Sequence, residues 1–228
     1  MRVEKAHLKV PVIDGKNALK RLERYGRVCY KSEDKFSLEE GGHGLLKTII
    51  AKNHESVLEH EKLSILFVID RGVSHELVRH RMASYSQEST RYCNYSKEKF
   101  GREITVIKPA FFKEDKQTIW EEAMSYIENS YFSLLDAGAK PEEARSILPN
   151  SLKTEIVVTM NYRSLRNFFQ LRCQVAAHPQ IKEVAIPLLR HLQKELPPLF
   201  MDITYDTNFS ENNYAHIVTT DEFFQEVE

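Results

Sequence analysis

Apolar side chains alternate with polar ones in some stretches of the chain and recur every third or fourth position in others. Alternation is typical of half-buried strands, and the longer period is typical of amphipathic helices. Residues 62–70 place apolar side chains at nearly every position, which predicts a strand buried on both faces. Further strands are predicted over 1–12, 104–107 and 151–161, with an extended loop or strand over 82–92.

Capping residues mark where the first two predicted helices begin. A short helix opens near Gly15, where apolar residues start to recur at helical spacing. Ser37 and Glu40 have the spacing of a capping box, in which each side chain bonds the other's backbone amide. A second helix should follow this box and end near Lys52.

The remaining helices follow the same pattern. Ser74 is the predicted cap of a third helix, whose C-terminal end carries residues 79–81. The segment after Pro197 is expected to contain at most one short helix. Further helices are predicted over about 113–136, 141–149, 161–172 and 180–195.

The helix over 113–136 is long and has an apolar stripe that suits a core or a subunit interface, and Gly138 should end it. The stripe consists of Ile119, Ala123, Ile127, Tyr131 and Leu134, widened by Trp120 and Met124.

Together these elements predict an α+β fold with a mixed, largely antiparallel central sheet flanked by long helices. A chain of 228 residues suits one domain of ordinary size. No repeat, low-complexity stretch or obvious linker divides it. We therefore expect a single domain over residues 1–228.

Charge and cysteine content narrow the class of protein. Lys plus Arg number 32 against 33 Asp plus Glu, and a net charge of -1 argues against a generic nucleic-acid binder. The N-terminus lacks the apolar core of a signal peptide, and no stretch approaches the roughly 18 apolar residues of a membrane span. Three distant cysteines, Cys29, Cys93 and Cys173, indicate free thiols in a reducing compartment. A cytoplasmic protein is expected.

The candidate chemistry is concentrated in residues 79–92. This segment holds three arginines (Arg79, Arg81 and Arg91), four Ser or Thr hydroxyls and one acid, Glu88. Guanidinium groups and short hydroxyl side chains are suited to phosphate, because a guanidinium donates parallel hydrogen bonds to an oxyanion. On composition alone, a surface or interface segment whose arginines pair with carboxylates elsewhere in the fold is about as good an interpretation.

Histidines near these segments do not have the spacing of a metal site. His54 and His60 would point about 240° apart on a helix, at about 100° per residue. His75 and His80 are five residues apart, whereas a zinc-protease helix needs a spacing of four. No metal is predicted.

The order Arg79-His80-Arg81, seven residues, Ser89 and then Arg91-Tyr92 resembles the signature of the flavin-dependent thymidylate synthases. Three further segments are similar to segments of that family. They are His54 to His60, Glu142 to Pro149 with Arg145, and Asn161 to Arg172.

A weaker likeness lies at Arg27 to Ser32, where Gly26 replaces the family's alanine, and a small buried cysteine at a helix end is an equally good interpretation of Cys29. Ala177-His178-Pro179-Gln180-Ile181 departs from the family's usual continuation, which leaves a flavin contact by His178 open.

The resemblance implies the residues of a site. Helical spacing places Arg163 and Asn167 on one face and Arg172 roughly opposite. For Arg145, set among apolar neighbours, a structural ion pair is the alternative. For FAD the resemblance implies Cys29, His54, Ser56, Glu59, Arg79, His80, Arg81, Met82, Asn161, Arg163, Asn167 and Leu171. For dUMP it implies Glu76, Arg79, Gln87, Glu88, Ser89, Thr90, Arg91, Arg145 and Arg172, with Arg172 and Ser89 as catalytic residues.

The same resemblance implies reductive methylation of dUMP to dTMP. Methylenetetrahydrofolate would give the carbon, NADPH the electrons, and FAD would carry the hydride, without a cysteine nucleophile. It also implies a homotetramer with shared active sites, and no nucleic-acid or membrane partner. The alternative from another class is a non-catalytic nucleotide- or RNA-binding module that uses the Arg79–Arg91 cluster for phosphate.

Overall fold

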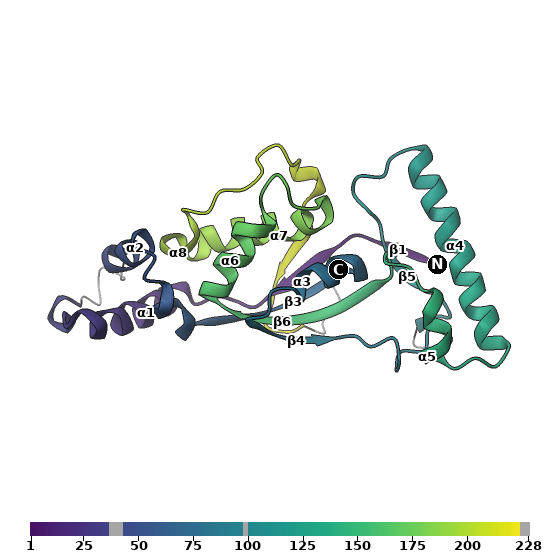
Figure 1. The fold of residues 1–228 in the computed structure, drawn as a ribbon, viewed down its shortest axis with the longest axis horizontal. Coiled ribbons are helices and arrows are strands. Elements are labelled where there is room, and N and C mark those ends of the chain that lie inside the picture. The colour runs from purple at the N-terminus through teal and green to yellow at the C-terminus, as the bar shows by residue number, and fades with distance from the viewer. Residues whose placement is uncertain (37–42, 98–99, 224–228) are drawn as a thin grey trace.

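A five-stranded sheet and a separate pair of strands form the framework of the chain (Figure 1). The computed structural model describes residues 1–36, 43–97 and 100–223. The order of the large sheet is β4-β6-β3-β2-β7, and β1 pairs with β5 in the small one. The strands are β1 Arg2–Glu4, β2 His7–Val10, β3 Lys62–Asp70, β4 Ala83–Gln87, β5 Thr105–Ile107, β6 Lys153–Asn161 and β7 His216–Thr219.

The helices pack on the large sheet or stand at the ends of the molecule. They are α1 Gly15–Tyr30, α2 His43–Ala51, α3 Arg71–Leu77, α4 Asp115–Asp136, α5 Pro141–Ala144, α6 Tyr162–Arg172, α7 Pro179–Glu195 and α8 Pro197–Phe200. Short 3-10 turns cover Glu33–Lys35, Glu55–His60, Arg145–Ile147 and Glu211–Asn213. No helix in the described part of the chain is long and apolar enough to cross a bilayer.

Antiparallel pairing dominates the large sheet. β3 pairs with β6 over nine residues, from Lys62 opposite Asn161 to Asp70 opposite Lys153. β4 is antiparallel to β6, β2 is antiparallel to β3, and only β7 joins in parallel, beside β2. The predicted α+β class with a mixed, largely antiparallel sheet is therefore confirmed.

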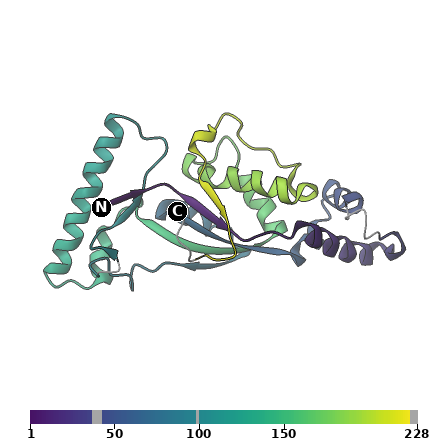
Figure 2. The same cartoon turned by 180° about the vertical axis from the view of Figure 1, so that it is seen from behind.

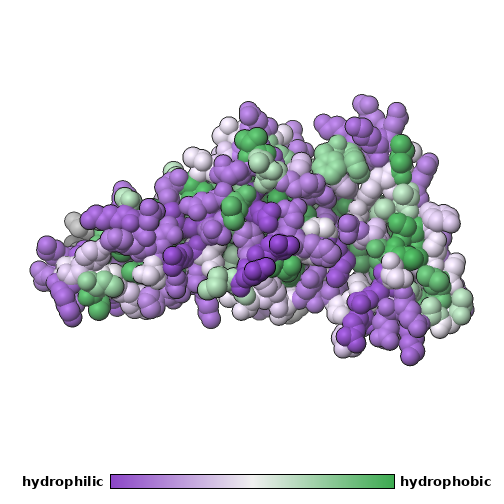
Figure 3. Space-filling view, in the orientation of Figure 1, coloured by the Kyte–Doolittle hydropathy of each residue, from purple (hydrophilic) through white to green (hydrophobic). Residues whose placement is uncertain are grey.

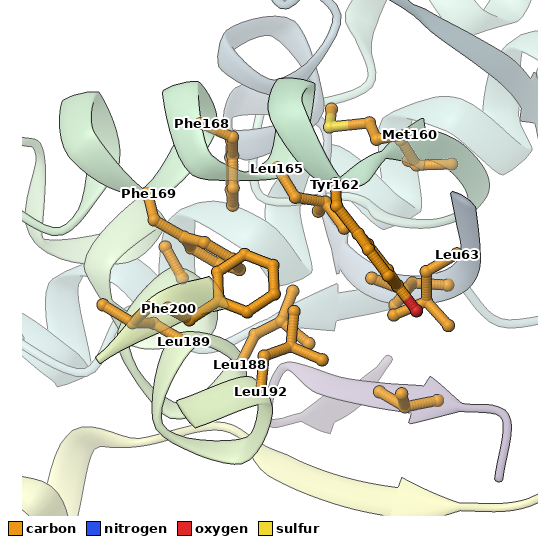
Figure 4. Close-up of a cluster of buried hydrophobic side chains, with 14 of the residues drawn as sticks. Leu63, Met160, Tyr162, Leu165, Phe168, Phe169, Leu188, Leu189, Leu192 and Phe200 are labelled. Carbon is orange, nitrogen blue, oxygen red and sulfur yellow. The ribbon is translucent and has the colours of Figure 1, made fainter. Parts of the chain in front are cut away.

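The main core lies between this sheet and α6, α7 and α8. Every second residue of β6 is buried, so Ile156, Val158 and Met160 face the helices. Aromatic and aliphatic side chains from the helices meet them (Figure 4). The labelled group includes Phe168 and Phe169 of α6 and Leu188, Leu189 and Leu192 of α7.

A smaller core forms around α4. Trp120, Met124 and Tyr131 are buried there, against residues of β5 and the chain before β6. Ile119, a member of the predicted apolar stripe, is 66% exposed, so the stripe of α4 is divided between the core and the surface. Seen from behind (Figure 2), α4 stands at one end of the molecule and α1 with α2 at the other. Apolar side chains gather on the surface of the α4 end (Figure 3).

Two boundaries near the N-terminus differ from prediction. The single strand expected over 1–12 is two strands in different sheets, because β1 pairs with β5 whereas β2 pairs with β3 and β7. The first helix is not short, since α1 runs for 16 residues.

At Gly26 a Cβ would lie 2.9 Å from Ile49 Cδ1, so glycine permits the close approach of α1 and α2. The predicted capping box of Ser37 and Glu40 lies outside the described residues.

The third helix and the C-terminal segment also differ. Asp70, not Ser74, caps α3: its side chain accepts a hydrogen bond from the Val73 amide at 2.8 Å, and Ser74 is buried inside the helix. After Pro197 the chain adds β7 as an edge strand, which the prediction of one short helix missed. The four residues of β7 are too few to show a period, and their partner β2 lies at the other end of the sequence.

The C-terminal segment also supplies an acid, Asp202, to a buried arginine of α6. Arg166 is 2% exposed, and its guanidinium bonds Glu55 Oε1 at 2.7 Å and both carboxylate oxygens of Asp202 at 2.7 and 2.6 Å. It also donates to the carbonyl of Leu199. This network fastens α6 to the turn that precedes β3 and to the chain after α8.

We therefore expect the Arg166→Ala substitution to lower the free energy of unfolding by about 3 kcal/mol, because it leaves a buried ion-pair network without its cation. Arg163→Ala is the matched control, one turn earlier on α6. Arg163 pairs with Glu59 in solvent, with side chains 52% and 45% exposed, and should cost roughly 0–1 kcal/mol. Urea unfolding of both variants measures the difference, and equal costs would contradict the structural role of Arg166.

Candidate functional site

A cleft of about 800 Å³ lies between α6 and the turn that joins α3 to β4. Its volume is within the range of small-molecule sites. The cleft is lined by Glu59, Arg79, His80, Arg81, Met82, Asn161, Arg163, Ser164, Asn167, Leu171 and Arg172. All of them except Ser164 were predicted site residues, so segments about 80 residues apart in the chain meet here.

Residues at the start of α6 form one side of the cleft. Asn161 ends β6 and caps the helix, its side-chain oxygen accepting from the Ser164 amide at 2.8 Å. Arg163 and Asn167 follow at a spacing of four and line the cleft together, as helical geometry predicts. Asn161 thus has a structural partner as well as a place in the cleft wall.

Tyr85 anchors the other side. Its hydroxyl approaches the carbonyl oxygens of Leu77 at 2.9 Å and His80 at 2.5 Å, which fixes the turn between α3 and β4. Burial raises the pKa of Tyr85 to about 12, so it keeps its proton for these bonds. No role was predicted for this residue from the sequence. Its position on the inward face of β4, alternating with exposed Ser84 and Ser86, is the signal that could have found it.

Two arginines of the cleft have no acidic partner. Arg79 and Arg81 are exposed, and neither forms a hydrogen bond or ion pair through its side chain with any of the residues that the structure describes. Among the described residues, the guanidinium of Arg91 interacts only with the ring of Tyr92, its carbon lying 5.6 Å from the ring centroid. Within that part of the chain, the interpretation in which these arginines pair with carboxylates finds no support. Their charge is available to an anion.

Arg172, unlike Arg79 and Arg81, forms hydrogen bonds with neighbouring side chains in the described part of the chain. Its Nη1 donates to Glu76 Oε2 at 2.9 Å and its Nε donates to His80 Nε2 at 3.0 Å. Helical spacing had placed it opposite Arg163 and Asn167, yet it lines the same cleft. The spacing fixes only the direction of the Cα–Cβ bond, and a long arginine side chain can reach around the helix end.

His80 is neutral at the pH of cells. Burial, together with the charge of Arg172, lowers its pKa to about 4. Since Nε2 accepts a hydrogen bond from Arg172, the ring proton belongs on Nδ1. The imidazole also packs edge-on against Phe168, with the ring centroids 5.0 Å apart. The cleft therefore contains a neutral imidazole beside a fixed cation.

Three predicted flavin contacts lie elsewhere, near the end of α1. His54 Nδ1 is 2.7 Å from the hydroxyl of Tyr30, and Ser56 is exposed in the following turn. Cys29 is at a helix end, as its alternative interpretation requires, but it is exposed and not buried. None of these residues lines the cleft.

Most of the predicted nucleotide contacts form a third group, at the end of β4 and just after it. Gln87 donates to Ser74 Oγ at 3.0 Å and to Thr154 Oγ1 at 3.1 Å, and Glu88 accepts from Tyr95 at 2.9 Å. Ser89 also has a partner within this group, since its hydroxyl oxygen accepts a hydrogen bond from the Arg91 amide at 3.3 Å.

The predicted apolar setting of Arg145 is wrong. Ala144 is buried, but the side chain of Arg145 is exposed and lies 3.5 Å from Thr90 Oγ1. Of the predicted nucleotide residues, Arg79 and Arg172 line the cleft of one chain, and Glu76 lies beside it as the partner of Arg172. The others are not part of that cleft.

The sequence of the chain matches a known protein family. The family model described as thymidylate synthase complementing protein matches residues 12–198. The chain is similar to the flavin-dependent thymidylate synthase of Geobacter sulfurreducens, at 38% identity over 183 residues, which cover 77% of this chain and 78% of that protein. It is similar to that of Thermococcus kodakarensis, at 40% identity over 161 residues, which cover 68% of this chain and 64% of that protein. It is also similar to the flavin-dependent thymidylate synthase of Saccharolobus solfataricus, at 36% identity over 183 residues, which cover 78% of this chain and 69% of that protein.

The electrostatics of His80 can be measured. We expect its NMR titration to fall near pH 4 and to move up in Arg172→Gln, because loss of the neighbouring cation and entry of water both favour imidazolium. Since the ordinary pKa of about 6.5 applies to the unfolded chain, His80 should reduce stability as the pH falls from about 6.5 towards 4. His80→Gln identifies the resonance, and Arg163→Gln is the control. A wild-type titration near 6.5 would contradict this geometry.

Proposed function

The chain belongs to the flavin-dependent thymidylate synthase family, and from this we propose that it methylates dUMP reductively to dTMP. Methylenetetrahydrofolate is the proposed carbon donor, NADPH the reductant and FAD the resident cofactor. The observation that supports this most directly is the cleft in which Arg79 and Arg81 lie without acidic partners. A cofactor with two phosphates supplies the negative charge that these side chains lack.

The residues of the cleft fit a flavin dinucleotide. Arg79 and Arg81 offer guanidinium donors, Asn167 offers an amide, and the neutral His80 ring offers its Nδ1 proton. Leu171 and Met82 give the cleft apolar surface on which a flat ring can lie. When bound, the flavin supplies hydride chemistry, and the protein supplies position and charge.

Arg172 is the residue that we propose to act on the pyrimidine. Glu76 and His80 hold its guanidinium on two sides, so its position is fixed before a substrate arrives. A preorganised cation can stabilise negative charge that develops on a reacting ring. Ser89, Gln87 and Arg91, assisted by Arg145, are the proposed contacts of the nucleotide phosphate, and Ser89 donates to that phosphate in place of acting as a nucleophile.

A cysteine nucleophile is not part of the proposal. Cys173, which directly follows Arg172, is fully buried, and burial raises the pKa of its thiol far above the ordinary value. A thiolate is the reactive form, so this side chain is suited to packing. We propose that its partners are small molecules, because a net charge of -1 does not favour nucleic acid. We place the enzyme in the cytoplasm.

A shared site explains why the predicted nucleotide contacts lie apart from the cleft. We propose that the active sites form between chains of a homotetramer, where the Gln87–Arg91 segment and Arg145 of one copy complete the cleft of another. The exposed Ile119 and Tyr126 of α4, 66% and 75% exposed, offer apolar surface for contacts between copies.

The purified protein should therefore be yellow and should oxidise NADPH faster when dUMP is added.

Arg81→Gln should weaken flavin binding at least tenfold, about 1.4 kcal/mol, because a charge-assisted hydrogen bond to phosphate is lost. Arg102→Gln is the control, since Arg102 pairs with Asp136 on the surface. Absorbance titration measures both. Colourless protein that binds oligonucleotides in a salt-dependent way would instead indicate the RNA-binding alternative.

Mixing two inactive variants tests the shared site. Arg91→Gln and Arg172→Gln should each lose dTMP formation, and dissociating and reassociating them together should restore part of it, because some mixed sites then receive both arginines from wild-type segments. Arg79→Gln mixed with Arg172→Gln is the control: both residues line one cleft, so no intact site should form. Failure of the first mixture, with mixed oligomers present, would show that each chain builds its own site.

A further inference from the structure

A second cavity, of about 270 Å³, lies where α7, the loop after β5 and the segment before β7 meet. Lys5, Lys108, Lys113 and Glu183 line it, together with Tyr214. None of these residues has a part in the proposed reaction. The cavity is near the lower end of the size range of small-molecule sites, so an occupant would be compact.

Glu183 is the unusual member of this lining. It lies on α7 and is 5% exposed, and its carboxyl group makes no hydrogen bond or ion pair with any described residue. Its backbone carbonyl accepts from the Ala215 amide at 2.9 Å, which fixes α7 against the chain that leads into β7. Burying a carboxyl group without a partner is costly, so its presence beside a cavity needs an explanation.

The neighbours of Glu183 determine its protonation. Burial and the nearby carboxylate of Asp70 raise its pKa to about 8, although Lys5 acts in the opposite direction. At neutral pH the group is therefore mostly a neutral carboxylic acid. A carboxylic acid can donate a hydrogen bond, which a carboxylate cannot do.

The charged groups around it are mainly cations. Lys5, Lys108 and Lys113 have no carboxylate partner within 4.0 Å among residues 1–36, 43–97 and 100–223. Glu114, exposed at the edge, is the one lining carboxylate besides Glu183. Three lysines line the cavity with one carboxylate and one neutral acid, and the nearby carboxylate of Asp70 does not cancel their charge. The cavity therefore attracts an anion and repels a cation.

We propose that this cavity binds a compact oxyanion, the phosphate or carboxylate group of a small metabolite. The lysine ammonium groups pair with its charge, and the carboxyl group of Glu183 donates a hydrogen bond to one of its oxygens. The recognition is of a charged oxygen acceptor, which phosphate and carboxylate share.

Titration calorimetry at neutral pH and constant ionic strength tests the site on the full-length, flavin-containing protein. The probes are sodium phosphate, for the phosphate class, and sodium succinate, for the carboxylate class, with sodium chloride as the reference. The double substitution Lys108→Gln with Lys113→Gln should raise the dissociation constant of the bound probe at least tenfold. Lys116→Gln, an exposed lysine of α4 outside the cavity lining, should change it less than twofold.

Two further variants separate this cavity from the cleft. Glu183→Gln keeps a hydrogen-bond donor and should retain binding, whereas Glu183→Leu should weaken it at least tenfold. Arg79→Gln should leave the cavity's binding unchanged, which makes this test independent of the proposed reaction. The proposal is overturned if both probes match chloride, if the double lysine variant binds as wild type does, or if Arg79→Gln abolishes the binding.

Discussion

The antiparallel pairing of β3 with β6 is the interaction on which the cleft depends. The two strands are joined over nine residues, and each leads directly into a helix. β3 ends at Asp70, which caps α3, and β6 ends at Asn161, which caps α6. The two caps have nearly the same backbone conformation, with φ near −75° and ψ near 164°. Because the two strands are antiparallel, their C-terminal residues lie at opposite ends of the pair, and α3 and α6 start far apart. The helices then run back over the same face of the sheet, and Arg172 at the end of α6 meets Glu76 of α3.

The arginines of this chain divide into those that hold the fold and those that do not. Arg166 is buried among Glu55 and Asp202, and Arg172 is fixed by Glu76. Arg79 and Arg81 have no such acids in the described structure, although the chain as a whole has one more acid than base. Overall composition therefore hides the local excess of positive charge, and only the placement of each guanidinium reveals it.

Periodicity and capping residues predicted most of the elements, because those signals are local. The boundaries of β3 and the existence of α4, α6 and α7 follow from them. β7 could not be predicted, since it is a strand only through its pairing with β2. The site shows the same limit. Motif spacing selected the residues of the cleft, but the exposure of Arg145 depends on how the turn after α5 packs, which no local pattern encodes.

Asp70 is connected both to the helix that precedes Arg79 and Arg81 and to Glu183 of the second cavity. Its carboxylate receives hydrogen bonds from the Val73 amide at 2.8 Å and from Gln180 of α7 at 2.6 Å. These bonds stabilise its charged form, although burial acts against it and raises its pKa. Glu183, one turn further along α7, is buried beside the same acid without comparable donors. Two buried carboxyl groups this close do not ionise together easily, and the one with hydrogen-bond donors is the better anion. The cap that starts α3, and so places Arg79 and Arg81, is therefore also a reason why Glu183 remains protonated.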